Sequence, residues 1–221
     1  MCRKARFGMS KFIKRILCLL ITVFISLVIT GCKKDVAEEP IPDFKEVNAI
    51  KVNEDLSISL TLVDTFTEDY YRTDELLKML SDEASAFNGV NGSGSLVAEK
   101  VEEKDGYVNV VMRFSGREAY VAYNEAVFFV GTVEAALNSG LRLNQTLIDI
   151  TDPEKSITGD DLASMKDTYI LITNDHLVLQ PLTIETFGRI SYVTAGLEPW
   201  YGRNSVRITA VKDELIYILF K

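Results

Sequence analysis

The first 32 residues constrain the fold most, because most of them are predicted to be absent from the mature protein. Residues 1–15 carry six basic side chains and no acidic one, and the apolar run Ile16–Thr30 follows. A basic segment, a short apolar segment and small residues in this order are typical of a secretory signal peptide. A membrane-spanning helix needs about 20 apolar residues, and this run is shorter. We therefore predict a cleaved signal peptide over residues 1–31; the alternative is an uncleaved anchor.

The residues at the end of the apolar run form a short motif. Ile29, Thr30 and Gly31 stand directly before Cys32. This order resembles the lipobox of bacterial lipoproteins, in which an aliphatic residue, a small or β-branched residue, and Gly or Ala precede an invariant cysteine. The resemblance implies that Cys32 receives a thioether-linked diacylglycerol and becomes the mature N-terminus. Acyl chains such as palmitate then hold the protein on the membrane, and two chains hold stably where one does not.

The resemblance also implies a location, which is the extracytoplasmic face of the bacterial cell membrane. As a whole, the chain resembles small surface lipoproteins of Gram-positive bacteria with no described activity. The lipobox, the acidic domain and the β-rich end Leu215–Phe220 carry this likeness. It supplies no catalytic residue.

The composition of the mature chain excludes some partners and some ways of holding a fold together. Without residues 1–31, Lys+Arg falls from 24 to 18 while Asp+Glu stays at 32, so the formal net charge becomes −14. Such a surface repels phosphate backbones, and we expect no nucleic-acid partner. Cys2 and Cys18 leave with the signal peptide, so no intramolecular disulfide is possible. The core must therefore be held by burial alone, for which the remaining length is sufficient.

The mature chain divides into a linker and one domain. The segment from Lys33 to about Glu46 is charged, contains Pro40 and Pro42, and shows no hydrophobic period. We predict a lipidated Cys32 with a flexible tether over 32–46, followed by a single globular domain over 47–221.

The domain is predicted to be α+β, mainly antiparallel, with one longer helix and two short ones. Apolar residues alternate from Leu56 to Val63, which favours a strand. Over about 73–87 apolar residues recur at helical spacing, and we predict a helix there with Thr73 as its N-cap and Asn88-Gly89 as its end. Asp105-Gly106 between two alternating runs predicts a hairpin over 96–114. Local hairpins dominate and no regular strand–helix–strand alternation appears, which favours antiparallel pairing.

The remaining elements follow from shorter patterns. Thr132 and Thr158 are predicted to cap short helices over 133–138 and 158–165, and 89–95 is predicted to be a loop. Strands are expected at 119–123, 126–130, 169–173, 177–179, 189–194, 205–211 and 215–220. Tight turns are expected at Asn174-Asp175 and at Lys212-Asp213; residues 141–153 fit no single pattern.

Sequence motifs do not indicate an enzyme. His176 is the only histidine, it stands beside a predicted turn, and we interpret it as an exposed loop residue; we predict no metal site, no cofactor and no catalytic residue. The glycine-rich segment 89–95 follows a helix rather than a strand, unlike a phosphate-binding loop. Paired acids at 68–69, 74–75, 102–103 and 160–161 are interpreted as solvated surface. A hydrolase that uses two carboxylates on a cell-wall glycan stays open as the alternative.

The strongest candidate for a binding site is the segment Glu198–Asn204. It places Trp200, the only tryptophan, beside Tyr201 and Arg203 in a predicted loop between two strands. These three residue types are enriched at binding hot spots. A tryptophan that folds back to cover an open end of the core is the alternative. We therefore expect a non-enzymatic module whose partner is a protein or a cell-wall glycan.

Overall fold

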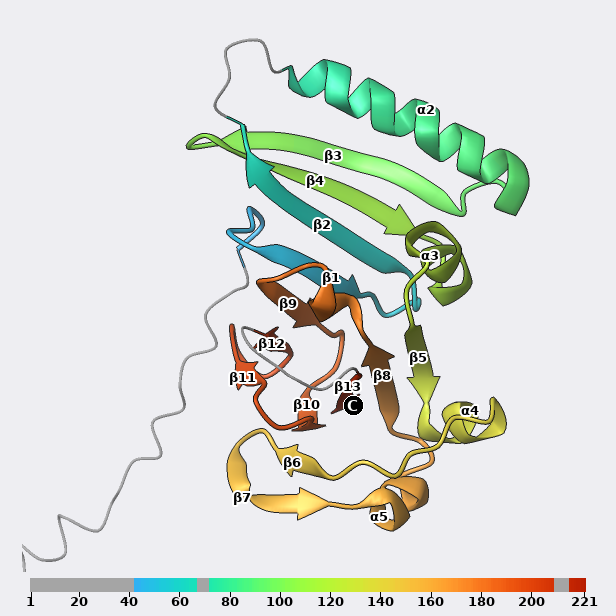
Figure 1. Cartoon of the computed structure of the whole chain (residues 1–221), viewed down its shortest axis with the longest axis vertical. Helices are drawn as coiled ribbons and strands as arrows, with labels where there is room; N and C mark the ends of the chain where they lie inside the picture. The colour runs from blue at the N-terminus through green and yellow to red at the C-terminus, as the bar shows by residue number, and fades with distance from the viewer. Residues whose placement is uncertain (1–41, 67–71, 209–214) are drawn as a thin grey trace, which may run out of the picture. The chain divides into compact units, whose positions relative to one another are not determined.

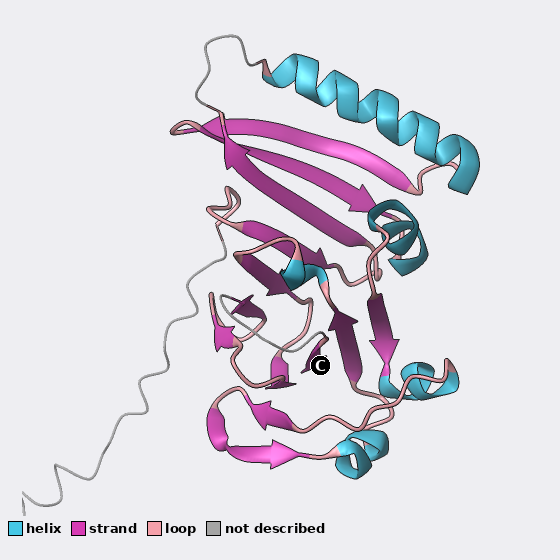
Figure 2. Cartoon of the chain, in the orientation of Figure 1, coloured by secondary structure: helices cyan, strands magenta, loops and turns pink. Residues whose placement is uncertain are grey.

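The computed structural model describes residues 42–66, 72–208 and 215–221. All of them belong to one compact unit, Glu38–Lys221. Strands make up more of the described chain than helices do (Figure 2). The unit holds both of the sheets described below and the hydrophobic cores packed on them, and we expect it to fold independently. Cys32 and the predicted signal peptide lie outside the described residues.

The first sheet has seven strands and is antiparallel except at one pair. Strands β1 and β9 run parallel, and every other neighbouring pair is antiparallel. The spatial order is β11 (Glu198–Pro199), β12 (Ser205–Ile208), β9 (Leu182–Glu185), β1 (Asn48–Val52), β2 (Ile58–Thr65), β4 (Tyr107–Phe114) and β3 (Leu96–Lys104) (Figure 1).

The second sheet has six strands, all antiparallel. Its order is β5 (Phe128–Thr132), β8 (Tyr169–Thr173), β13 (Ile216–Phe220), β10 (Ile190–Val193), β6 (Leu147–Asp149) and β7 (Asp152–Ile157). The helices in the described part of the chain are α2 (Thr73–Asn91), α3 (Arg117–Asn124), α4 (Val133–Asn138) and α5 (Gly159–Ser164), with a 3₁₀ turn η1 (Asp175–Leu177). The predicted fold class, a mainly antiparallel α+β domain, is confirmed.

Two hydrophobic clusters hold these elements together. The main core joins the apolar face of the seven-stranded sheet to one face of the six-stranded sheet and to α2 and α3, through residues such as Ile50, Ile218 and Ala84. The second core lies on the other face of the six-stranded sheet, under α4 and α5, and contains Leu162 and Ile170. The strands β5, β8 and β13 of the six-stranded sheet are therefore buried on both faces, whereas the seven-stranded sheet is covered by apolar packing on one face.

The sequence patterns of the strands follow from this difference. In β13 every residue is buried, and its sequence, Ile-Tyr-Ile-Leu-Phe, is apolar throughout. In β2, Ile58 and Leu60 are in the main core, while Ser59 and Thr61 point to the opposite face. A strand buried on both faces reads as an apolar run, and one buried on a single face alternates. We call the polar face of the seven-stranded sheet the outer face.

Three of the predictions based on turn and cap chemistry are confirmed. The hairpin β3–β4 turns at Asp105 and Gly106, whose φ angles are 53° and 79°, as a two-residue turn of this composition requires. The Thr132 hydroxyl accepts a hydrogen bond from the Ala135 amide at 3.1 Å and caps α4. Thr158 and Asp161 form a capping box at the start of α5.

The predicted ends of the long helix were wrong at both termini. Its N-cap residue is Arg72, not Thr73, and makes no side-chain capping hydrogen bond. The helix continues through Gly89 to Asn91 and ends at Gly92, which has a φ of 101°. Asn88 does not stop the helix, because its side chain instead pairs with the backbone of Leu96 through two hydrogen bonds of 2.8 Å. The predicted loop 89–95 is correspondingly shorter.

The predicted strand over 119–123 is wrong, because this segment lies in α3. Tyr120 is fully buried. Its ring packs edge-on against Phe114, with ring centroids 5.1 Å apart, and at a tilt against Phe128, with ring centroids 4.5 Å apart. The alternation of apolar residues is too short to distinguish a strand from a helix, and contacts with distant aromatic rings decide the outcome. The following strand is β5, which begins two residues later than the predicted one.

The predicted hairpin around Asn174-Asp175 is also wrong. The chain enters η1 there, and β8 pairs with the distant strands β5 and β13. His176, interpreted above as an exposed loop residue, lies in η1 and is fully buried. The turn predicted at Lys212-Asp213 lies outside the described residues, and the strands on either side of it, β12 and β13, belong to different sheets.

Candidate functional site

The segment predicted to carry the site is the connection of a short hairpin at the edge of the seven-stranded sheet. Glu198 and Pro199 form β11 and pair with Arg207 and Val206 of β12. The Trp200 amide donates a hydrogen bond to the Ser205 carbonyl at 3.0 Å. The prediction of a connection between two strands is therefore confirmed, and Trp200 begins it.

Trp200 lies on the outer face and not in either hydrophobic core. The Arg207 guanidinium is 4.3 Å from the centroid of the indole ring, and the Tyr201 ring meets it edge-on at 5.2 Å. The side chain keeps 38% of its surface exposed and belongs to neither the main nor the second core. The alternative of a tryptophan that covers the core does not describe this arrangement.

The cation beside the tryptophan is not the one that the sequence suggested. Arg203 is exposed, and its backbone carbonyl accepts a hydrogen bond from the Ile190 amide at 2.7 Å. Arg207, which sequence reasoning missed, makes the cation–π contact. The alternation of Ser-Val-Arg-Ile in β12 was the available signal, because Val206 and Ile208 are buried in the main core and Arg207 must point the other way.

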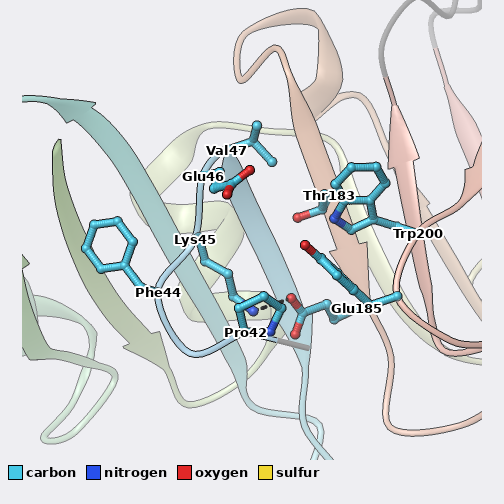
Figure 3. A pocket seen from close by; sticks show the side chains of 9 residues that line it. Pro42, Phe44, Lys45, Glu46, Val47, Thr183, Glu185 and Trp200 are labelled. Carbon is cyan, nitrogen blue, oxygen red and sulfur yellow. Dashed lines mark hydrogen bonds and ion pairs between the residues drawn. The ribbon is translucent and has the colours of Figure 1, made fainter. Parts of the chain in front are cut away.

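Residues 42–47, which we call the N-terminal strap, cross the outer face beside Trp200. The Lys45 ammonium forms an ion pair with Glu185 Oε1 at 2.6 Å (Figure 3). The Asn109 side chain holds the backbone of Lys45 in both directions, accepting from its amide at 2.6 Å and donating to its carbonyl at 2.9 Å. Asn109 and Glu185 are buried, so the last part of the predicted flexible tether is in fact fixed to the sheet.

The strap and the tryptophan enclose a pocket that is too small for an organic ligand. Figure 3 shows Lys45 and Glu185 on one side of it and Trp200 on the other. Its cavity volume is about 20 Å³. A single water needs about that much, whereas small-molecule sites span roughly 300–1,000 Å³. A ligand must therefore contact Trp200 from the surface.

A more open polar groove continues along the outer face on the other side of the Lys45–Glu185 pair. Its two adjoining parts have volumes of about 290 and 450 Å³ and share Lys51, Ser59 and Glu99. Arg113 crosses it and forms ion pairs with Asp55 at 2.7 Å and with Glu99 at 3.8 Å. Charges of both signs and hydroxyl groups alternate along the groove, which suits a polar ligand without a large net charge.

Two polar atoms beside Trp200 have unused hydrogen-bonding capacity. Ser205 Oγ and Arg207 Nε are buried and have no hydrogen-bond partner in the described part of the chain. Both residues belong to β12 and point to the outer face. Buried polar atoms are normally satisfied, so polar ligand atoms that reach them would gain hydrogen bonds.

Two of the described carboxyl groups, those of Asp55 and Asp175, have shifted pKa values without forming a catalytic arrangement with each other. Hydrogen bonds from Ser57 lower the pKa of Asp55, which keeps it ionised and makes it a poor proton donor. Burial raises the pKa of Asp175, but this residue lies in η1 and does not line the polar groove. Its carboxylate accepts hydrogen bonds from Thr173 at 2.6 Å and from Tyr120 at 3.1 Å. Among the described residues, no group of three or more His, Cys, Asp or Glu side chains is placed to hold a metal ion.

Two of the predicted acidic pairs are explained by their position at the start of a helix. Asp74 and Glu75 lie in the first turn of α2, and Asp160 and Asp161 lie in that of α5, where the helix dipole favours negative charge. Residues 68–69 lie outside the described ranges.

Among residues 42–66, 72–208 and 215–221, no helix has both the length and the apolar character needed to cross a membrane. A comparison with protein-family models, curated proteins and solved structures finds no match to this chain.

Proposed function

We propose that this chain is a lipid-anchored, extracytoplasmic binding module that uses the outer face of its seven-stranded sheet around Trp200. The observation that carries the proposal is the tryptophan itself, 38% exposed, outside both cores and stacked against Arg207. A large aromatic side chain fixed in this way offers contact area at little cost in conformational entropy. Tyr201 and the neighbouring polar groove extend the same surface.

The partner classes that fit this surface are a protein and a cell-wall glycan. A sugar ring can stack on Trp200 while its hydroxyl groups reach the polar groove. That combination favours carbohydrate recognition as the second candidate function. A hydrolase is a weaker candidate, since hydrogen bonds from Ser57 lower the pKa of Asp55 in the groove and keep this carboxyl group ionised.

The lipid anchor is the first part of the proposal, and it rests on Ile29-Thr30-Gly31-Cys32. Cells expressing the full chain and fed an alkyne-labelled palmitate should incorporate label into the wild type, and the protein should fractionate with membranes. The Cys32→Ala variant should incorporate none, because the thiol that accepts the diacylglycerol is missing. Equal labelling of both forms would contradict lipidation at this residue.

The binding surface is the second part, and it is tested by capture. The compact unit, residues 38–221, is immobilised and exposed to solubilised membranes and to cell-wall fragments. Retention by the Trp200→Ala, Tyr201→Ala double variant should fall at least tenfold, while its melting temperature stays within a few degrees because neither side chain is in a core. Tyr107→Ala is the matched control, since Tyr107 is 49% exposed on β4, away from the β11–β12 edge of the same sheet.

The outcomes of the capture experiment separate the two partner classes. Retained material that a muramidase releases is a glycan, and retained material that a protease removes is a protein. Unchanged retention by the double variant would contradict the proposed surface, whichever class is captured.

A further inference from the structure

The second core extends beyond the part of the six-stranded sheet that α4 and α5 cover. Phe129, Ile172 and Tyr217 are register neighbours across β5, β8 and β13 and point to the face that α4 and α5 cover. These three residues also line a groove of about 510 Å³, bounded by α3 on one side and by Leu141 and its neighbours after α4 on the other. The volume lies within the range of small-molecule sites.

The walls of this groove are mostly apolar, and part of them is exposed. Val121, Leu141 and Leu215 are only partly buried, and Val127 keeps 50% of its surface exposed. Exposed apolar surface that is continuous with a core, and hollow rather than flat, favours a bound apolar chain. No lining residue of this groove belongs to the surface around Trp200.

The rim of the groove carries more positive than negative charge. Arg117 donates a hydrogen bond to Glu118 Oε1 at 2.7 Å, and its guanidinium lies 4.7 Å from the centroid of the Phe129 ring. That pair neutralises itself, because the same hydrogen bond lowers the pKa of Glu118 and keeps it ionised. Arg142 is exposed and forms no ion pair with any described residue. Among the described residues it is therefore a positive charge without a counterion, on an acidic protein, at the mouth of an apolar groove.

We infer that this groove binds a linear amphipathic carboxylate, with its aliphatic chain along Phe129, Ile172 and Tyr217 and its carboxylate at Arg142. An apolar floor with one guanidinium at the rim that no described carboxylate pairs with matches a ligand with one charged end and one apolar end. Arginine is suited to the carboxylate because its planar donors can pair with both oxygens. The inference is independent of the proposed function, since it uses another sheet and other residues.

The compact unit, residues 38–221, is titrated with dodecanoate below its critical micelle concentration, and binding is measured by isothermal titration calorimetry. The account predicts saturable binding with one site, and weaker binding of both dodecanol and dodecylammonium. Arg142→Glu should weaken dodecanoate binding about tenfold or more, because it replaces attraction by repulsion at an exposed position. Ala122→Trp, which adds bulk on the α3 wall, should also reduce it.

Two matched controls lie on α2, away from the groove. Lys78→Glu makes the same charge change at an exposed position, and Ala86→Trp adds the same bulk to an exposed helix face. Both should bind dodecanoate as the wild type does. No saturable binding by the wild type, equal loss in the control variants, or unchanged binding by Arg142→Glu would each overturn the inference.

Discussion

At the residue scale, the buried polar groups show how distant parts of the chain fix one another. Asp175 accepts hydrogen bonds from the hydroxyls of Thr173 and Tyr120, and burial raises its pKa as well as that of Tyr120. The carboxyl group thus connects η1 to α3. His176, beside it, is buried too. Sequence alone suggested a surface turn here, because the partners of these side chains come from elements that are remote in sequence.

The role of Asp175 leads to a prediction about stability and pH. Asp175→Ala should lower the free energy of unfolding by about 1–3 kcal/mol, because two buried hydroxyls lose their acceptor. Asp175→Asn keeps an acceptor oxygen and should cost less. The raised pKa means that the folded state binds this proton more tightly than the unfolded state does. The contribution of Asp175 to stability therefore falls as pH rises from its ordinary value of 3.8 through the raised one.

Urea unfolding of wild type and Asp175→Asn at about pH 4 and about pH 7 measures this effect. The difference in unfolding free energy should shift in favour of the variant at the higher pH. Comparison of the two proteins cancels the contributions of groups such as Asp55 and Asp149, whose pKa values are lowered. A difference that does not change with pH would contradict the assignment.

At the element scale, the correctly predicted turns and caps are those that are determined by residues close together in the sequence. The Asp105-Gly106 turn, the Thr132 cap and the Thr158 capping box are decided within a few residues, and all three are as expected. The helix α3 and the end of α2 are decided by packing. Tyr120 reaches Phe114 and Phe128, and Asn88 pairs with Leu96, and neither contact can be read from a local pattern.

The extension of α2 predicts opposite effects for two nearby glycines. Gly89 is inside the helix, and a Cβ added there would meet no atom within 4 Å. Gly89→Ala should therefore raise the free energy of unfolding by about 0.5–1 kcal/mol. Gly92 has a φ of 101°, and Gly92→Ala should destabilise the protein by a similar amount or more. Thermal unfolding distinguishes the two; destabilisation by Gly89→Ala would place the end of the helix at Asn88 after all.

At the scale of the whole molecule, one face of the seven-stranded sheet is packed in the main core, and the other carries the surface that we propose for binding. One face supplies the main core, and the outer face carries the strap, Trp200 and the polar groove. The sequence predicted Trp200 and Tyr201 as candidates from residue type alone. It could not predict Glu185 or Lys45 as their neighbours, because β9 and the strap reach this surface only through contacts between segments that are remote in sequence. The anchor at Cys32 stays a prediction from the sequence.

The most direct test of the account uses the fact that Trp200 is the only tryptophan in the chain. Its fluorescence reports on the proposed surface without any label. Acrylamide quenching of this fluorescence is measured in the compact unit, alone and with the material retained in the capture experiment. The account predicts that quenching falls saturably as that material is added, because a bound partner covers the ring. Quenching that stays unchanged while the same material demonstrably binds would show that the partner contacts another surface, and would contradict the central claim.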